Sequence, residues 1–315
     1  MPVYLVESTK TSCAAAGCLC RDRKPRYPSD LTDEQWTLLR PEVEAVMAEL
    51  RRGPGGRAMV HDLRAVVDAI GYITRYGIEW RALPADFPPW RAVYAFFERW
   101  SQRGMPQRLV DGLRARLRVA VGRAPLPTAG VIDAQSVKAA DTVGAASRGY
   151  DAGKKINGRK RHIVVDSLGL LLVVVITAAS MQDRDAAFRV LGAVRERFST
   201  ISLVWADGGY AGRLVDWAKS VLALTVQIVK RNDNTAGFTV LPRRWVVERT
   251  FGWLLRYRRL VRDYERRPEH HEAMVLWVNV TIMTRKLHQA TSKKPPDTRW
   301  GRPRTGPPAP LEQAA

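Results

Sequence analysis

Apolar positions along the chain change their spacing near residue 125. Before that point they recur with the period of amphipathic helices, and Pro- and Gly-containing segments separate the runs. The pattern predicts a helix after a capping box at Thr32–Gln35, a second one opened by Pro41, and further helices over Met59–Ile73, Trp90–Trp100 and Pro106–Val121. Residues 27–123 are therefore expected to form an all-helical domain.

After residue 125, short apolar runs alternate with helical ones. Strands are predicted at Val131-Ile132, His162–Val165, Leu170–Ile176, Ile201–Ala206 and Leu224–Val229. Helices are predicted over Asp185–Phe198, Gly212–Leu222, Arg244–Arg259 and Glu272–Leu287. Asp166 is expected in a hairpin turn, and His270 and His271 in a solvated loop. The order favours an α/β core over residues 129–290, a mixed five-stranded sheet with flanking helices.

The two ends of the chain lack this periodicity. Residues 1–26 and the proline-rich residues 291–315 are expected to be disordered tails. The three cysteines are Cys13, Cys18 and Cys20. An odd, clustered set favours a reducing compartment over a disulfide framework. The longest apolar run, residues 168–179, is too short to span a bilayer, so we expect a cytoplasmic protein, associated with the nucleoid in a prokaryote, and no membrane partner.

The net charge of the chain indicates which kind of molecule it binds. The 315 residues include 51 Lys plus Arg against 31 Asp plus Glu, a net charge of +20, while 46% are hydrophobic. The hydrophobic content excludes a wholly disordered chain. The excess of base indicates a polyanion such as a nucleic acid, and Arg suits phosphate because its planar fork offers several donors.

Three acidic residues lie at positions where an acid is unusual unless it has a role. Asp133 follows the apolar pair Val131-Ile132, Asp207 ends the strand before two glycines, and Glu248 lies in an apolar helix. Sites in open α/β sheets form beyond the carboxyl ends of strands. Three carboxylates there could hold two Mg²⁺ ions for phosphodiester chemistry. Each acid alone also has a structural interpretation, as a turn residue or as an ion-pair partner of Arg244.

Several longer motifs carry a resemblance. They are VIDAQSVKAADTVG (131–144), GYDAGKKINGRKRHIVVDSLGLLL (149–172), MQDRDAA (181–187), VWADGGYAG (204–212) and VLPRRWVVERTFGWLLRYRRLVRDYE (240–265), with YPSDLTDEQWTLLRP (27–41) and WRALPADFPPWRAVYAFFERW (80–100) before them. In this order they resemble the insertion-sequence-five family of transposases with an Asp-Asp-Glu site. The resemblance implies an RNase-H-like catalytic core.

The resemblance also implies an activity. In that family the two Asp lie on the first and fourth strands and the Glu on a later helix, places matched by Asp133, Asp207 and Glu248. It implies two Mg²⁺ ions (Mn²⁺ being possible), cleavage of double-stranded DNA at terminal inverted repeats bound by the helical domain, and attack of the freed 3′-OH on target DNA. Pairing two ends implies at least a dimer. A silent DNA-binding derivative and another RNase-H-like nuclease stay open as alternatives.

Basic residues near the acids are the candidates for DNA contact. They are Lys154, Lys155, Arg159, Lys160 and Arg161, which could also form a solvated strand edge, and Arg244, Arg249, Arg256 and Arg259. The sequence departs from the signature of the wider transposase group, because Leu241 and Leu255 replace its Tyr and Lys. Continuing the helix past Glu248 brings Arg259 back to the same face, so Arg259 or Arg256 is expected to replace that Lys.

Overall fold

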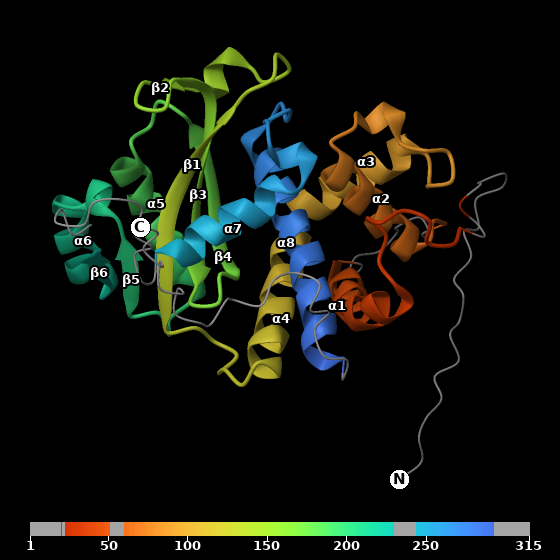
Figure 1. Ribbon diagram of the computed structural model, residues 1–315, viewed down its shortest axis with the longest axis horizontal. Coiled ribbons are helices and arrows are strands. Elements are labelled where there is room, and N and C mark those ends of the chain that lie inside the picture. Colours follow the sequence, from red (N-terminus) through yellow and green to blue (C-terminus); the bar gives the residue numbers. More distant parts are fainter. Residues whose placement is uncertain (1–19, 21–22, 51–59, 230–243, 293–315) are drawn as a thin grey trace, which may run out of the picture.

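The computed structural model describes residues 20, 23–50, 60–229 and 244–292. Helices α1–α3 gather at one end of the molecule, and a sheet with its covering helices forms the other (Figure 1). Helices α4 and α8 lie between the two. The predicted order, helices first and then a mixed sheet with helices on its faces, is confirmed.

The N-terminal helices are α1 (Asp33–Leu50), α2 (Leu63–Tyr76), α3 (Trp90–Gln102) and α4 (Met105–Ala120). Thr32 caps α1 by accepting a hydrogen bond from the Gln35 amide, and Gly77 ends α2 with φ of 70°. The separate helix predicted at Pro41 is wrong, because α1 continues through it. One apolar face, with Leu39 and Val43 fully buried, spans both sides of the proline, and its packing outweighs the missing N–H donor.

Among the described residues the sheet has six strands, one more than predicted. They are β1 (Ala129–Lys138), β2 (Gly149–Asp151), β3 (Ile156–Asp166), β4 (Leu171–Ala178), β5 (Leu203–Ala206) and β6 (Thr225–Ile228). Their order is β2-β3-β1-β5-β6, with β4 also paired to β3. β1 runs antiparallel to β3 and parallel to β5. The additional strand β2 has three residues, too few to show an alternating pattern.

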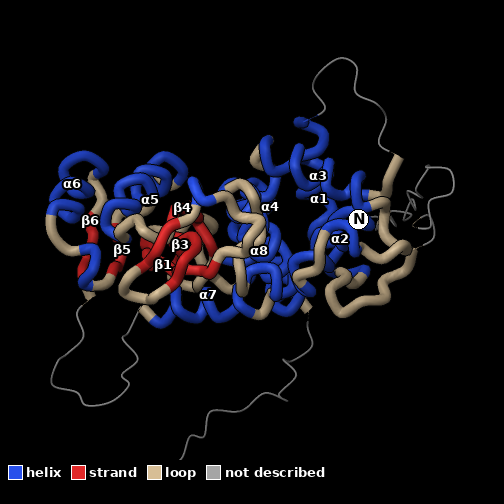
Figure 2. Tube along the Cα trace, turned by 90° about the horizontal axis from the view of Figure 1, so that it is seen from above, coloured by secondary structure: helices blue, strands red, loops and turns tan. Residues whose placement is uncertain are grey.

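Helices cover both faces of the sheet (Figure 2). On one face, α5 (Asp183–Arg197) and α6 (Arg213–Leu222) pack on a core that includes Ile132 and Val204. On the other, α7 (Trp245–Leu255) and α8 (Pro268–Thr291) pack on residues such as Val131. Helix α7 ends four residues before its predicted end at Arg259, where a 3-10 turn (Arg258–Leu260) follows. Helix α8 begins four residues before its predicted start.

The core beneath α7 and α8 continues into the N-terminal helices. Trp277 of α8, Leu109 of α4 and Val131 of β1 belong to one cluster of buried side chains. A buried ion pair reinforces this junction, since Arg118 at the end of α4 contacts Asp166 in the β3–β4 turn. Asp166 also accepts hydrogen bonds from the amides of Leu168 and Leu170, as expected for a turn residue.

Part of the predicted N-terminal tail belongs to the fold. Cys20 is buried, and Arg23 forms an ion pair with Asp30 at 2.7 Å. Cys13 and Cys18, like most of residues 1–26 and 291–315, lie outside the described residues.

A second buried ionic cluster ties the chain after α7 to the sheet. Asp263 is fully buried and contacts Arg159 of β3 at 3.0 Å and His271 of α8 at 2.8 Å. His270 and His271 are therefore not in a solvated loop as predicted, since both lie buried in the first turns of α8. None of the described helices combines the length and the apolar character that crossing a membrane would need.

Candidate active site

The fold brings Asp133 and Asp207 to the same level of the sheet. Val131 of β1 pairs with Trp205 of β5 in the parallel register, so two further residues along each chain place Asp133 opposite Asp207. Side chains two residues apart in a strand point to the same face. Val131 and Trp205 pack into the core on the α7 face, and the two carboxylates therefore lie on that face as well.

Glu248 approaches from α7, which packs across this part of β1 (Figure 1). Val247 and Phe251 face the sheet, while the Glu248 side chain is 52% exposed. Arg244, at the start of the helix, connects the acids. Its guanidinium lies 3.6 Å from a carboxylate oxygen of Asp207 and 3.7 Å from one of Glu248. Asp207 and Glu248 thus share one basic side chain, which also lowers the pKa of Asp133.

The electrostatics of Asp133 reflect this crowding. Burial raises the pKa of its carboxyl to about 6, although the amide of Ala134 lowers it by donating a hydrogen bond. Repulsion from Asp207 contributes to the raised pKa, and Arg244 and Lys154 oppose it. A buried carboxyl with a second acid beside it favours a bound cation in place of its proton.

The turn between β2 and β3 places Lys154 at the site. Its Nζ lies 3.4 Å from the carbonyl oxygen of Ala134, next to Asp133, and its amide donates to Asp151 at 3.1 Å. The other carboxylate oxygen of Asp151 accepts from Ser136 of β1. Asp151 therefore holds the Lys154 turn against the strand that carries Asp133.

Tyr210 is a residue that the sequence prediction missed. It follows Asp207 by three residues, and its hydroxyl is buried without a hydrogen-bond partner among the described residues. Burial, then Asp133, Asp183 and Asp207, raise the pKa of Tyr210 well above its usual value. Its only signal in the sequence was its place in the motif VWADGGYAG (204–212).

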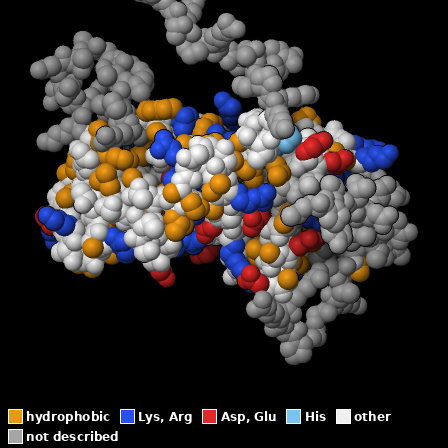
Figure 3. Space-filling model, turned by 90° about the horizontal axis from the view of Figure 1, so that it is seen from below, with side chains coloured by type: hydrophobic (Ala, Val, Ile, Leu, Met, Phe, Trp, Pro, Cys, Tyr) orange, Lys and Arg blue, Asp and Glu red, His pale blue; other side chains and the backbone are white. Residues whose placement is uncertain are grey.

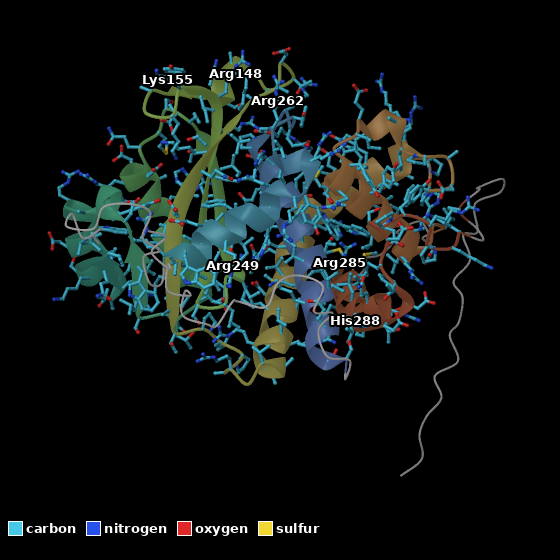
Figure 4. All side chains as sticks on the ribbon, viewed as in Figure 1. Arg148, Lys155, Arg249, Arg262, Arg285 and His288 are labelled. Atoms are coloured by element: carbon cyan, nitrogen blue, oxygen red, sulfur yellow. The ribbon has the colours of Figure 1, made fainter. Side chains whose placement is uncertain are left out.

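Three residues of the predicted basic run are not on the surface. Arg159 and Arg161 are 1% and 0% exposed, and Lys160 is 7% exposed. Arg161 donates to Gln135 and to the Leu260 carbonyl, and Lys160 forms an ion pair with Asp183 at 3.1 Å. The prediction that these three contact DNA is therefore wrong, because β3 is a central strand covered on both faces. Lys154 and Lys155 of the same run are exposed, and Lys155 lies at the upper end of the sheet (Figure 4).

The predicted arginines near Glu248 also differ in availability. Arg259 is 7% exposed and forms an ion pair with Glu265 at 2.7 Å, so it cannot replace the missing Lys of the wider signature. The predicted return to the Glu248 face fails because α7 ends at Leu255. Arg256 is exposed and Arg249 half-buried. Leu241 and Arg243 lie outside the described residues. Seen from below, Lys and Arg form separate groups among hydrophobic side chains (Figure 3).

Comparison with known proteins decides the family. A family model described as "Transposase DDE domain" matches residues 124–283, about half of the chain. The chain belongs to the DDE transposases. The match includes β1 and α7, which carry Asp133 and Glu248, and Asp207, which directly follows β5. The predicted fold class, an RNase-H-like core behind an all-helical region, is confirmed for this transposase.

The helical region matches a second family model, and a relative aligns with part of the chain. Residues 31–110 of this transposase match a model described as "Putative transposase of IS4/5 family". Over 125 residues the chain is 33% identical to a "Putative transposase for insertion sequence element IS402" from Burkholderia cepacia. That alignment covers 38% of this chain and 59% of the relative. The chain thus matches somewhat more than half the length of that protein.

Divalent metal ions are implied for a DDE transposase. The side chains that would hold them in this protein are the carboxylates of the three acids. Among the described residues, no three His, Cys, Asp or Glu side chains stand ready to hold a metal ion. The chemistry of the three acids nevertheless fits, because carboxylate oxygens are the ligands that Mg²⁺ prefers. The raised pKa of Asp133 and the guanidinium between Asp207 and Glu248 both indicate a place where negative charge requires a cation.

Proposed function

We propose that this protein cuts double-stranded DNA at the terminal inverted repeats of its own insertion sequence and joins the resulting 3′-OH ends to target DNA. The alignment of Asp133 with Asp207 beneath Glu248 carries this proposal. Membership in the DDE transposases supports it. Recognition of the repeats is assigned to the helical region, and pairing of two ends to at least a dimer.

In this proposal Asp133, Asp207 and Glu248 hold two Mg²⁺ ions, with Mn²⁺ as a possible substitute. When bound, such ions activate the attacking oxygen and stabilise the leaving oxygen of a phosphodiester. The residues of the chain orient the substrate. Arg244 is placed to contact a phosphate oxygen, because a guanidinium recognises phosphate through paired donors. Lys154 lies beside the same site, with its Nζ against the Ala134 carbonyl oxygen next to Asp133.

The proposed function is tested with the DNA on either side of the gene. The full-length protein is incubated with labelled duplexes that contain the flanking inverted repeats, a target plasmid and Mg²⁺. We expect cuts that expose 3′-OH ends, followed by joined products, and neither in EDTA. Binding without cutting in Mg²⁺ or Mn²⁺ would instead indicate a silent DNA-binding derivative. Cleavage of RNA without joining would indicate another RNase-H-like nuclease.

Replacing Lys154 by Ala should slow strand cleavage about 10- to 100-fold, because a hydrogen bond to a charged group contributes about 1.5–3 kcal/mol. The variant Lys219→Ala is the control, since it removes the same charge from an exposed position on α6. Its cleavage rate should change less than threefold (about the effect of a remote surface charge). Single-turnover rates on prebound duplexes measure both. Equal rates for the two variants would remove Lys154 from the site.

A further inference from the structure

A group of basic side chains gathers around one aromatic ring at the junction of α7 and α8. Lys286 of α8 places its Nζ 3.7 Å from the centre of the Trp253 ring, and the Arg249 guanidinium lies 4.8 Å from the same ring. Arg249 also stacks over Trp245 at 4.2 Å. Arg256 lies one turn after Trp253 on the exposed side of α7. We call Lys286, Arg249, Arg256 and Trp253 the α7–α8 basic cluster.

Lys286 has no acid to balance it in this cluster, whereas Asp166 acts on Arg249 by raising its pKa. Burial, together with repulsion from Arg249 and Arg256, lowers the pKa of Lys286 to about 8, and no described carboxylate acts on it in the opposite direction. Arg249 donates to the carbonyl oxygen of Leu168, but its Nε is buried without a hydrogen-bond partner among the described residues. Its neighbourhood therefore contains unused donors as well as unbalanced charge.

Three other buried arginines have a carboxylate partner. Arg118, Arg159 and Arg259 pair with Asp166, Asp263 and Glu265. Arg161 instead donates to Gln135 and to the Leu260 carbonyl. A cation–π contact that only stabilises the fold needs no more than one cation on the ring. Crowding further positive groups around Trp253 costs free energy in the isolated protein, and an anion bound between them would recover it.

We propose that the α7–α8 basic cluster binds a backbone phosphate of the duplex DNA beside the cleavage site. Glu248 lies on the same helix, five residues before Trp253 and eight before Arg256. At 1.5 Å per residue these positions are about 7–12 Å from Glu248 along α7. Phosphates follow at about 3.4 Å along the axis of one strand, so with the duplex lying along α7 the bound phosphate is roughly two to four nucleotides from the cut. Figure 4 labels Arg249 on α7 and Arg285 on the neighbouring helix α8.

The inference rests on the proposed function and is tested by Lys286→Met. Methionine keeps a flexible apolar side chain on the Trp253 ring and removes only the charge. The affinity of the full-length protein for the inverted-repeat duplex should fall roughly tenfold, and the salt dependence of log K should decrease by about one unit. Lys219→Met is the control, because Lys219 is exposed on the distant helix α6. Its affinity should change less than threefold (about the effect of one remote charge).

A second measurement locates the contact. Duplexes with one neutral methylphosphonate at successive positions are titrated with the wild type and with Lys286→Met. One position, about two to four nucleotides from the cut, should weaken wild-type binding and have no further effect on the variant. If Lys286→Met unfolds, the exposed Arg256→Gln replaces it in the same scan.

The outcomes separate the two proposals. If the wild type cuts the duplex but Lys286→Met keeps its affinity and salt dependence, the phosphate site is wrong and the proposed function stands. The same holds if the variant loses affinity yet remains sensitive at every methylphosphonate that affects the wild type. A wild type that binds the duplex but does not cut it, while the scan locates the contact, supports the phosphate site and contradicts the nuclease. A wild type that does not bind the repeats overturns both.

Discussion

Replacing Asp133 by Asn is expected to reduce Mg²⁺-dependent strand cleavage at least about 10³-fold, because a metal-bound oxygen site supplies several kcal/mol of transition-state stabilisation. The substitution preserves the shape of the side chain and removes the charge between Asp207 and the Lys154 turn. Duplex binding should be retained within a few-fold, since the basic side chains are unchanged. Cleavage of labelled inverted-repeat duplexes and their binding curves measure the two quantities separately.

A folding defect would be visible in the same experiment. Burial raises the pKa of Asp133 to about 6, so its ionised form opposes folding at neutral pH. The melting temperature of Asp133→Asn should therefore not fall below that of the wild type. Asp141→Asn serves as the matched control, because this exposed acid follows β1 and has no place in the site. Cleavage by Asp133→Asn at the wild-type rate would contradict the assignment of the three acids.

The second large effect concerns stability. Asp263→Ala leaves Arg159 buried without its carboxylate and removes the partner of His271. Breaking a buried ion pair from one side costs about 3–5 kcal/mol. We expect the free energy of unfolding, measured by urea titration of the metal-free protein, to fall by that amount. Asp216→Ala removes an exposed acid from α6 and should change it by less than about 0.5 kcal/mol.

The stability that Asp263 and its partners contribute should change with pH in a defined direction. Burial alone would raise the pKa of Asp263, but His271, the Glu265 amide and Arg159 together hold it below its usual value of 3.8. A carboxyl with a lowered pKa stabilises the fold above its unfolded pKa, and that contribution is lost as the pH falls toward its folded pKa. Wild-type stability should thus decline below about pH 4, and Asp263→Ala should lack this part of the decline. Parallel slopes for both proteins would assign the acid sensitivity to other groups.

The places of the three acids in the fold could be predicted because they are local features of the sequence. Asp133 and Asp207 each follow a short apolar strand, and Glu248 interrupts an apolar helix. Such positions are recognisable without knowing which strands pair. The hairpin turn at Asp166 was predicted for the same reason, since a turn residue acts on its own neighbours.

The failed predictions depend on contacts between distant segments. Strand alternation suggested that some of Arg159, Lys160 and Arg161 face DNA, but the chain after α7 covers one face of β3, and Asp183 lies on the other. The acids that pair with Arg159 and Lys160, Asp263 and Asp183, are far away in the sequence. The end of α7 could not be predicted either, because the basic residues that follow Leu255 have a composition typical of a helix.

The packing of α8 against α4 has a consequence for the order in which the chain can mature. Helix α8 begins about 150 residues after α4 ends, yet Trp277 shares a core with Leu109 and Leu113. During synthesis, α1–α4 leave the ribosome with that apolar face uncovered. They cannot complete their core until almost all of the described chain has followed. A nascent chain truncated after α4 would expose an apolar surface to chaperones and proteases, whereas the finished protein covers that surface with α8.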